Sequence, residues 1–366
     1  MRRNDCEHRI VVMNVIRQLV LMLLVFPACA MAQQPIVIKF SHIVANAPPK
    51  GLAAEYFKKK AEEYTQGRVR VEVYANSTLY NDKEEVGALL KGDVQMLAPS
   101  FAKFSGLGVR AFELFELPYI FENYEQVHKI TEGPIGRSIL ARLEPKGIHG
   151  LAYWDNGFKS FSANEPIRLP TDLRGRKMRI QSSRVLEAQM HALGAVPVVM
   201  PFSEVYYALK TGALDGTENP ISNLYSQRMY EVQSHLTMTE HGYLGYAVIV
   251  NKTFWDGLPV WIRKQLALAM AESTKFANRI AKYRNNQDLE KLRKSGRTKI
   301  YYPSATEREA FRQALQPVHK EMAPRIGQGL LQGVYMALHP AESLRQPADS
   351  RRVAEDPLGA LRHDPM

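Results

Sequence analysis

Short strand patterns alternate with helical patterns along the sequence, and this alternation constrains the fold more than any other feature. Residues 36–40 have the pattern of a buried strand, and residues 69–73 alternate valine with charged residues, a period of two. Between them, residues 51–64 place apolar side chains along one helical stripe. A helix is predicted over 83–91 and a strand over 94–98. Strands separated by helices favour parallel pairing through right-handed crossovers, so we predict an α/β fold.

A second set of strand and helix patterns begins near residue 148. Its strands are predicted at 150–154, 177–181, 196–200 and 246–250, and its helices at 184–193, 203–210, 259–291, 305–316 and 317–338. The longest helix begins at Pro259, where a proline is tolerated. A chain of 366 residues exceeds one average domain, so two α/β lobes are expected.

The two ends of the chain differ from the rest. Basic residues precede an apolar run at 19–26, and an Ala-x-Ala site follows at 30–32, which predicts a cleaved signal peptide over residues 1–32. We therefore expect an exported, periplasmic protein that begins near Gln33. A buried N-terminal helix would not explain all three parts. Both cysteines lie in this segment, so the mature protein is expected to have no disulfide. Residues 339–366 are proline-rich without a periodic face and are predicted to be a disordered tail.

Composition and motifs exclude several classes of function. The formal net charge of +11 suits an anionic ligand or an acidic membrane surface, although a solvated basic surface would have the same charge. Nucleic acid is not expected, because no basic-aromatic motif is present and the chain is exported. The sequence has no nucleophile elbow, no metalloprotease helix and no phosphate-binding loop. His42, His241 and Asp215 are dispersed, so we predict no enzyme, no metal site and no cofactor.

Polar side chains lie where predicted strands end, which is where open α/β sheets bind ligands. They are Ser100 and Lys103 after the strand ending at 98, Asn156 and Lys159 after the strand ending at 154, and Asn219 after a turn at 215–217. Taken alone, each lysine could be an ordinary surface residue. Arg179 is different, because it lies inside a predicted strand between apolar residues. A buried arginine needs a partner, either a ligand carboxylate held by its planar fork or an internal carboxylate such as Glu218.

Several longer motifs make the sequence resemble a known family. They are FSH at 40–42, LPY at 117–119, NGFK at 156–159, LRGRKMR at 173–179 and DGTENP at 215–220. Together and in this order, they resemble the extracytoplasmic solute receptors of tripartite ATP-independent periplasmic (TRAP) transporters, especially the C4-dicarboxylate-binding (DctP-type) branch. The resemblance extends from about residue 36 to about residue 338.

The resemblance implies a two-lobed solute-binding fold that closes around an organic acid, with a long helix bracing both lobes. Lobe I would comprise residues 33–155 plus about 241–285, and lobe II residues 156–240 plus about 286–338. The segment 259–291 matches the bracing helix.

The resemblance also implies roles for single residues. Arg179 occupies the position that holds the ligand carboxylate, Asn219 matches an amide that contacts the same carboxylate, and Phe202 matches a pocket wall. Ser100, Lys103 and Lys159 resemble the dicarboxylate branch rather than the sialic-acid receptors. His42 and Lys50 resemble first-loop residues of that branch.

These expectations combine into one function. Arg179, Lys159 and Asn219 would hold one end of a dianion, and Ser100 and Lys103 the other, so that ligand binding favours lobe closure. Succinate, malate and fumarate are the expected ligands, and membrane permease subunits are the expected partner of a monomeric receptor. The alternatives are another organic acid (a 2-oxo acid, pyroglutamate or a sugar acid), a periplasmic hydrolase or lyase acting on small carboxylates, and a ligand-presenting partner of a sensor kinase.

Overall fold

The computed structural model describes residues 34–339. The predicted signal peptide, both cysteines and the predicted tail beyond His339 lie outside the described residues. Among the helices of the described part, none is both long and apolar enough to cross a membrane.

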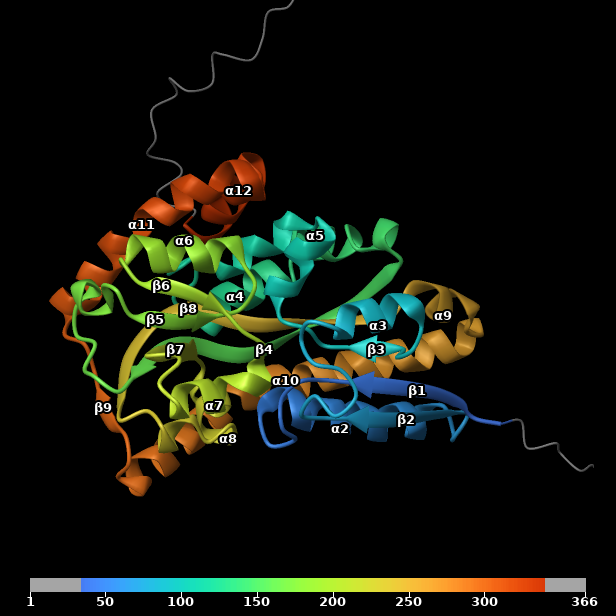
Figure 1. The fold of residues 1–366 in the computed structure, drawn as a ribbon. Coiled ribbons are helices and arrows are strands. Elements are labelled where there is room, and N and C mark those ends of the chain that lie inside the picture. The colour runs from blue at the N-terminus through green and yellow to red at the C-terminus, as the bar shows by residue number, and fades with distance from the viewer. Residues whose placement is uncertain (1–33, 340–366) are drawn as a thin grey trace, which may run out of the picture. The chain divides into compact units, whose positions relative to one another are not determined.

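Two long antiparallel strands, β4 (Ile148–Ala163) and β8 (His235–Asn251), form the middle of a mixed nine-stranded sheet. They pair along almost their whole length, from Ile148↔Asn251 to Ala163↔His235. Figure 1 shows them running side by side through the fold. All other strands attach to one end or the other of this central pair.

One end of the central pair carries the N-terminal strands. The short β3 (Met96–Leu97) pairs with the C-terminal part of β8, and β1 (Ile36–Ser41) lies parallel to β3. The strand β2 (Val69–Tyr74) is the neighbour of β1 at the edge. The predicted parallel relation of the first and third strands is therefore confirmed.

The opposite end of the central pair carries the second strand set. The strand β7 (Gly216–Asn219) pairs antiparallel with the C-terminal part of β4. The strand β5 (Lys177–Ile180) lies parallel to β7 and to the edge strand β6 (Val196–Val199). The strand β9 (Lys299–Tyr301) pairs with the N-terminal part of β8. The sheet is mixed because only the central pair and its direct neighbours β3 and β7 run antiparallel.

Helices connect and cover these strands (Figure 1). The α-helices are α2 (Pro49–Tyr64), α3 (Glu85–Lys91), α4 (Tyr124–Thr131), α5 (Pro134–Ala141), α6 (Arg184–Ala192), α7 (Val205–Lys210), α8 (Ile221–Ser226), α9 (Lys252–Gly257), α10 (Val260–Ser295), α11 (Ala305–Ile326) and α12 (Gln328–Leu338). The 3-10 helices are η1 (Phe101–Leu107), η2 (Arg110–Glu116), η3 (Glu144–Lys146), η4 (Pro170–Leu173), η5 (Phe202–Glu204) and η6 (Met229–Glu231).

The long helix α10 touches both strand sets and the central pair. It packs on α2, which follows β1, on α8, which follows β7, and on β4 itself. Its polar residues tie it to β4, because Asn278 Oδ1 accepts the Asp155 N–H at 3.0 Å and Asn285 Nδ2 donates to the Asn156 carbonyl at 2.7 Å. The predicted long helix is confirmed, and its position braces both ends of the sheet.

The structure corrects three predicted boundaries. The strands expected at 150–154 and 246–250 are only parts of β4 and β8. Irregularities in β4 at 155/157 and 159/161, and burial of consecutive residues, hide the period of two that identifies a strand. The expected turn at 215–217 is instead the beginning of β7.

The expected helix boundary at Pro317 is also wrong. The helix α11 continues through Pro317 and Pro324 to Ile326, because a proline removes a backbone hydrogen bond without always ending a helix. The chain breaks at Gly327, whose φ of +111° is readily adopted only by glycine. Where 203–210 was predicted as one helix, the short η5 leads into α7.

The contact between β7 and β4 predicts the effect of one substitution. A Cβ at Gly216 would lie 2.4 Å from the backbone oxygen of Ser162 and 2.9 Å from Met178. Gly216→Ala should therefore lower the free energy of unfolding by about 1–3 kcal/mol, measured by chemical denaturation. The matched control is Gly329→Ala in α12, where an added Cβ meets nothing within 4 Å and stability should stay level or rise slightly. Equal stability of both variants would contradict this close packing.

Candidate functional site

The residues predicted to bind a ligand are almost all inside the protein. Those with less than a tenth of their surface exposed are His42, Ser100, Asn156, Lys159, Arg179, Phe202 and Asn219. The side chain of Lys103 is 10% exposed. Buried polar and charged groups need partners, so the partners show what this site can do.

Arg179 comes from β5, where Met178 and Ile180 are buried beside it. Its Nε and Nη2 donate to the carbonyl of Met200 at 3.0 and 2.8 Å. The guanidinium lies 5.6 Å from the centre of the Phe202 ring. Burial lowers the pKa of Arg179 to about 10, while Asp82 and then Glu218 oppose this, so the side chain stays charged at neutral pH.

Asp82 joins two predicted cations, and sequence reasoning missed it. Its Oδ2 accepts from Lys103 Nζ at 2.8 Å and lies 3.9 Å from Arg179 Nη2, while its Oδ1 accepts the Phe202 N–H at 3.2 Å. Asp82 therefore brings Arg179, Lys103 and Phe202 together. The internal carboxylate at ion-pair distance from Arg179 is Asp82, not Glu218 as the sequence suggested. In sequence, Asp82 resembles an ordinary polar residue before a helix.

Tyr246 of β8 brings together a second group of predicted residues. Its hydroxyl oxygen accepts from Asn156 Nδ2 at 2.8 Å, and its backbone pairs with Ser100 as an isolated bridge. Lys50 Nζ lies 3.9 Å from the ring centre and donates to the Ala98 carbonyl at 3.0 Å. Ser100 Oγ in turn accepts from Gln181 Nε2 at 2.8 Å. No motif identified Tyr246 or Gln181, because only pairing across the sheet places them here.

Lys159 and Asn156 lie within β4, not after its end, which corrects their predicted position. Lys159 Nζ lies 2.5 Å from Glu218 Oε1. Burial alone would raise the pKa of the Glu218 carboxyl, but Lys159 and His241 more than offset burial, so this pKa lies well below its ordinary value. The charge of Lys159 is thus neutralised within the protein.

A chain of hydrogen bonds continues from Glu218. Its Oε2 accepts from Gln189 Nε2 and from His241 Nε2, both at 2.7 Å. Burial lowers the pKa of His241, so its ring is neutral, and Nδ1 accepts from the Thr239 hydroxyl at 2.7 Å. This sequence of hydroxyl, imidazole and carboxylate has the bonds of a catalytic triad. However, Thr239 and His241 are both 0% exposed, so the chain supports Lys159 rather than presenting a nucleophile.

Two predicted residues are not joined to Arg179 by a described contact. Asn219, the last residue of β7, donates from Nδ2 to Thr217 Oγ1 at 3.2 Å. Burial and the nearby Lys50 lower the pKa of His42 to about 3, so His42 is neutral. The cluster therefore combines cations, amides, hydroxyls and an aromatic wall, which suits a small organic anion.

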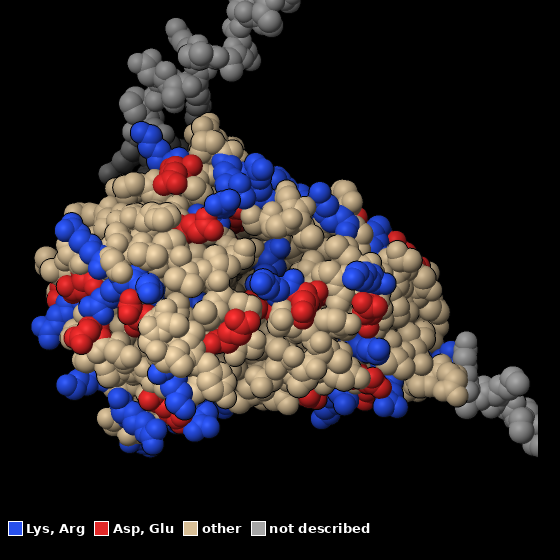
Figure 2. All heavy atoms as spheres, in the orientation of Figure 1, with Lys and Arg blue, Asp and Glu red and all other residues tan. Residues whose placement is uncertain are grey.

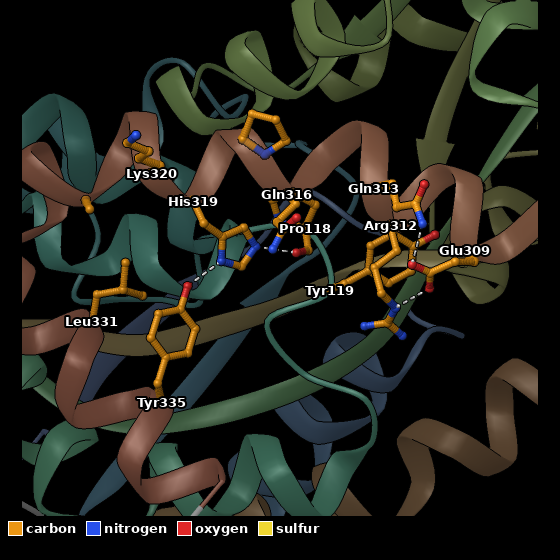
Figure 3. A pocket seen from close by; sticks show the side chains of 12 residues that line it. Pro118, Tyr119, Glu309, Arg312, Gln313, Gln316, His319, Lys320, Leu331 and Tyr335 are labelled. Atoms are coloured by element: carbon orange, nitrogen blue, oxygen red, sulfur yellow. Dashed lines mark hydrogen bonds and ion pairs between the residues drawn. The ribbon is translucent and has the colours of Figure 1, made fainter. Parts of the chain in front are cut away.

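A separate cavity of about 820 Å³ lies between α11, α12 and the segment at Pro118. Figure 3 shows His319 between Tyr335 and Pro118. Its ring nitrogens lie 2.5 Å from the Tyr335 hydroxyl and 2.6 Å from the Pro118 carbonyl, and Arg312 stacks 4.8 Å from the Tyr119 ring. None of the predicted ligand residues lines this cavity, so we place the candidate site at the buried polar cluster.

Neither metals nor a continuous basic patch explains the cluster. Within residues 34–339, no group of three or more His, Cys, Asp or Glu side chains is arranged to hold a metal ion. On the face in Figure 2, lysines and arginines are interspersed with acidic side chains. The cations that can select a ligand are therefore the buried ones.

Comparison with known proteins gives a consistent result. The model of the family "Bacterial extracellular solute-binding protein, family 7" matches residues 40–325. The C4-dicarboxylate-binding periplasmic protein DctP of Rhodobacter capsulatus is 61% identical over 294 residues, 80% of this chain and 88% of the relative.

Two solved structures are similar along most of the chain. A TRAP periplasmic solute-binding protein from Shewanella oneidensis with bound succinate is 40% identical, with a TM-score of 0.81 over 83% of this chain and 100% of that one. A TRAP periplasmic solute-binding protein from Pseudomonas aeruginosa with bound L-malate is 41% identical, with a TM-score of 0.77 over 78% of this chain and 100% of that one.

The Lys159–Glu218 pair predicts a pH-dependent loss of stability. Glu218→Gln should lower the free energy of unfolding by about 3–5 kcal/mol at neutral pH, because it leaves Lys159 buried without its counterion. The folded-state pKa of Glu218 is below its unfolded value, so its stabilising effect is present above the unfolded pKa of about 4.3 and is lost as pH falls below it. The difference between wild type and variant, measured by denaturation, should shrink below about pH 4.

The matched control is Glu187→Gln, since Glu187 pairs with the exposed Arg184 on the surface and should matter little. A Glu218→Gln variant as stable as this control would mean that Lys159 does not depend on Glu218.

Proposed function

The chain belongs to family 7 of the bacterial extracellular solute-binding proteins, and from this premise we propose that it is the periplasmic receptor of a TRAP transporter that captures a C4-dicarboxylate. The family resemblance and the solute-binding fold predicted from the sequence are thereby confirmed. Relatives named or crystallised as dicarboxylate binders support the ligand class, with succinate and malate as its members. Periplasmic location agrees with the names of these relatives.

The observation that carries the proposal is the convergence of Arg179 and Lys103 on one buried point. Both cations lie within 4 Å of the Asp82 carboxylate, Arg179 from β5 and Lys103 from η1. A carboxylate is therefore already the group that these side chains hold. A second carboxylate, from a ligand, would have two cations from opposite strand sets to bind.

The ligand would be held from two sides. We assign one carboxylate to Arg179 and Asn219, with Phe202 as the apolar wall, and the other to Ser100 and Lys103. Asn156 and His42 would complete the polar lining, and Lys159 would act mainly through Glu218. Because both sets of contacts exist only when the two sides approach, ligand binding stabilises the closed state. Closure also removes water, which strengthens each ion pair.

The proposed lobes have boundaries at about 155, 240 and 285. Each boundary falls within an element that reaches both strand sets, namely β4, β8 and α10. Bending at these three places would change the distance between Arg179 and Lys103 while leaving each strand set intact. This supports lobe I as 33–155 plus about 241–285 and lobe II as 156–240 plus about 286–338.

The receptor would pass its ligand to membrane permease subunits and act as a monomer, without catalysis, metal or cofactor. Another small organic acid, such as a 2-oxo acid, pyroglutamate or a sugar acid, is the alternative ligand class, because the arginine recognises a carboxylate and not the rest of the molecule.

The ligand class is tested by isothermal titration of the purified protein, refolded to remove co-purified ligand. Succinate, malate and fumarate should bind with micromolar or lower Kd and remain unchanged afterwards. Binding only of another acid in the panel would change the ligand class, and consumption of any ligand would contradict the receptor function.

The site is tested by Arg179→Ala. The variant should bind the preferred dicarboxylate about 30-fold or more weakly, because truncating one member of a buried charge pair costs about 2–5 kcal/mol. Arg184→Ala is the matched control, since Arg184 is exposed and should leave Kd unchanged. Unchanged affinity in Arg179→Ala would remove this residue from the site.

A further inference from the structure

Glu85 is a buried carboxyl group that no step of the proposed function uses. It is the first residue of α3, and only 1% of its surface is exposed. Neither carboxylate oxygen has a hydrogen-bond partner within the described part of the chain. Since an ionised carboxylate is strongly stabilised by hydrogen bonds, this environment favours the neutral acid.

The charged and titratable groups that face Glu85 come from four segments. They are Lys50 from α2, Asp82 from the loop before α3, Lys103 from η1 and Tyr246 from β8. The two cations have other acceptors, since Lys50 donates to the Ala98 carbonyl and Lys103 to Asp82. The face of the Tyr246 ring also favours a charged Lys50. Glu85 is thus the group in this cluster whose charge has the weakest support.

We propose that Glu85 takes up a proton from solvent when a dicarboxylate binds, so that the receptor binds its dianion together with one proton. The Glu85 carboxylate becomes a neutral acid with a new O–H bond, and Lys50 remains an ammonium. The inference rests on the proposed function, because it needs an anion to enter beside Lys103. It adds Glu85 as a residue that determines which charge state of the ligand is bound.

The electrostatics of the cluster support this direction. Burial raises the pKa of Glu85 to about 7, and Lys50 and Lys103 only partly oppose it. Near neutral pH, Glu85 is therefore partly ionised before the ligand arrives. A second negative charge held by the same cations disfavours ionised Glu85 further, so protons should be taken up on binding.

The test is isothermal titration with succinate in two buffers of different ionisation enthalpy. The dependence of the heat on the buffer gives the number of protons taken up. The wild type should take up about half a proton at about pH 7 and approach about one at about pH 8. Its Kd should rise by up to about tenfold per pH unit above about pH 7.5.

Glu85→Gln imitates the neutral acid and identifies the group. Its proton uptake should be close to zero, its Kd should be flat with pH, and it should bind more tightly than the wild type at about pH 8.5. The matched control is Glu84→Gln, because Glu84 is the exposed neighbour on the same turn and should keep the wild-type proton uptake. Uptake that persists in Glu85→Gln would assign the proton to Lys50 or Glu116 and overturn the proposal.

A stability measurement separates this proposal from the proposed function. If succinate and the other dicarboxylates do not bind, the function is wrong, and Glu85 is judged by thermal melting of the free protein. A carboxyl whose pKa is higher in the folded state costs stability as pH rises from its unfolded value to its folded value. Between about pH 5 and about pH 7.5, the wild type should lose melting temperature relative to Glu85→Gln. Parallel curves for the two proteins would overturn the proposal.

Discussion

The antiparallel ladder between β4 and β8 is the constraint on which the rest of the structure depends. Both strands reach from one strand set to the other, and α10 is hydrogen-bonded along β4. Because both faces are covered, most residues of these strands are buried, including the polar ones. Polar groups in such a ladder can persist only if each finds a partner.

The charged residues of the interior solve this problem in different ways. Lys159 has a dedicated carboxylate in Glu218, which His241 and Gln189 hold in place. Lys103 shares Asp82 with Arg179. In contrast, Lys50 depends on a carbonyl and an aromatic ring, and Glu85 has no hydrogen-bond partner among the described residues. The interior is therefore fully neutralised around Lys159 and less so around Lys50.

This difference connects stability to ligand binding. A fully compensated pair contributes little to recognition, because a ligand would have to displace its partner. A cluster with loosely compensated cations gains when an anion enters it, and that gain is available only when the strand sets approach each other. The proposed proton on Glu85 would adjust the same balance, since it removes a negative charge at the moment a ligand supplies two.

Local patterns in the sequence were sufficient to predict the α/β class, most helices and strands, the long helix α10 and a buried Arg179, because each of these depends on periodicity or on immediate neighbours. The family motifs added Asn219, Phe202 and the expected ligand class. The full length of β4 and β8 could not be predicted, because bulges and burial on both faces remove the period of two. The roles of Asp82, Tyr246 and Glu218 were decided only by the tertiary structure, because charge pairing between residues far apart in sequence depends on strand order and register, which leave no trace in local spacing.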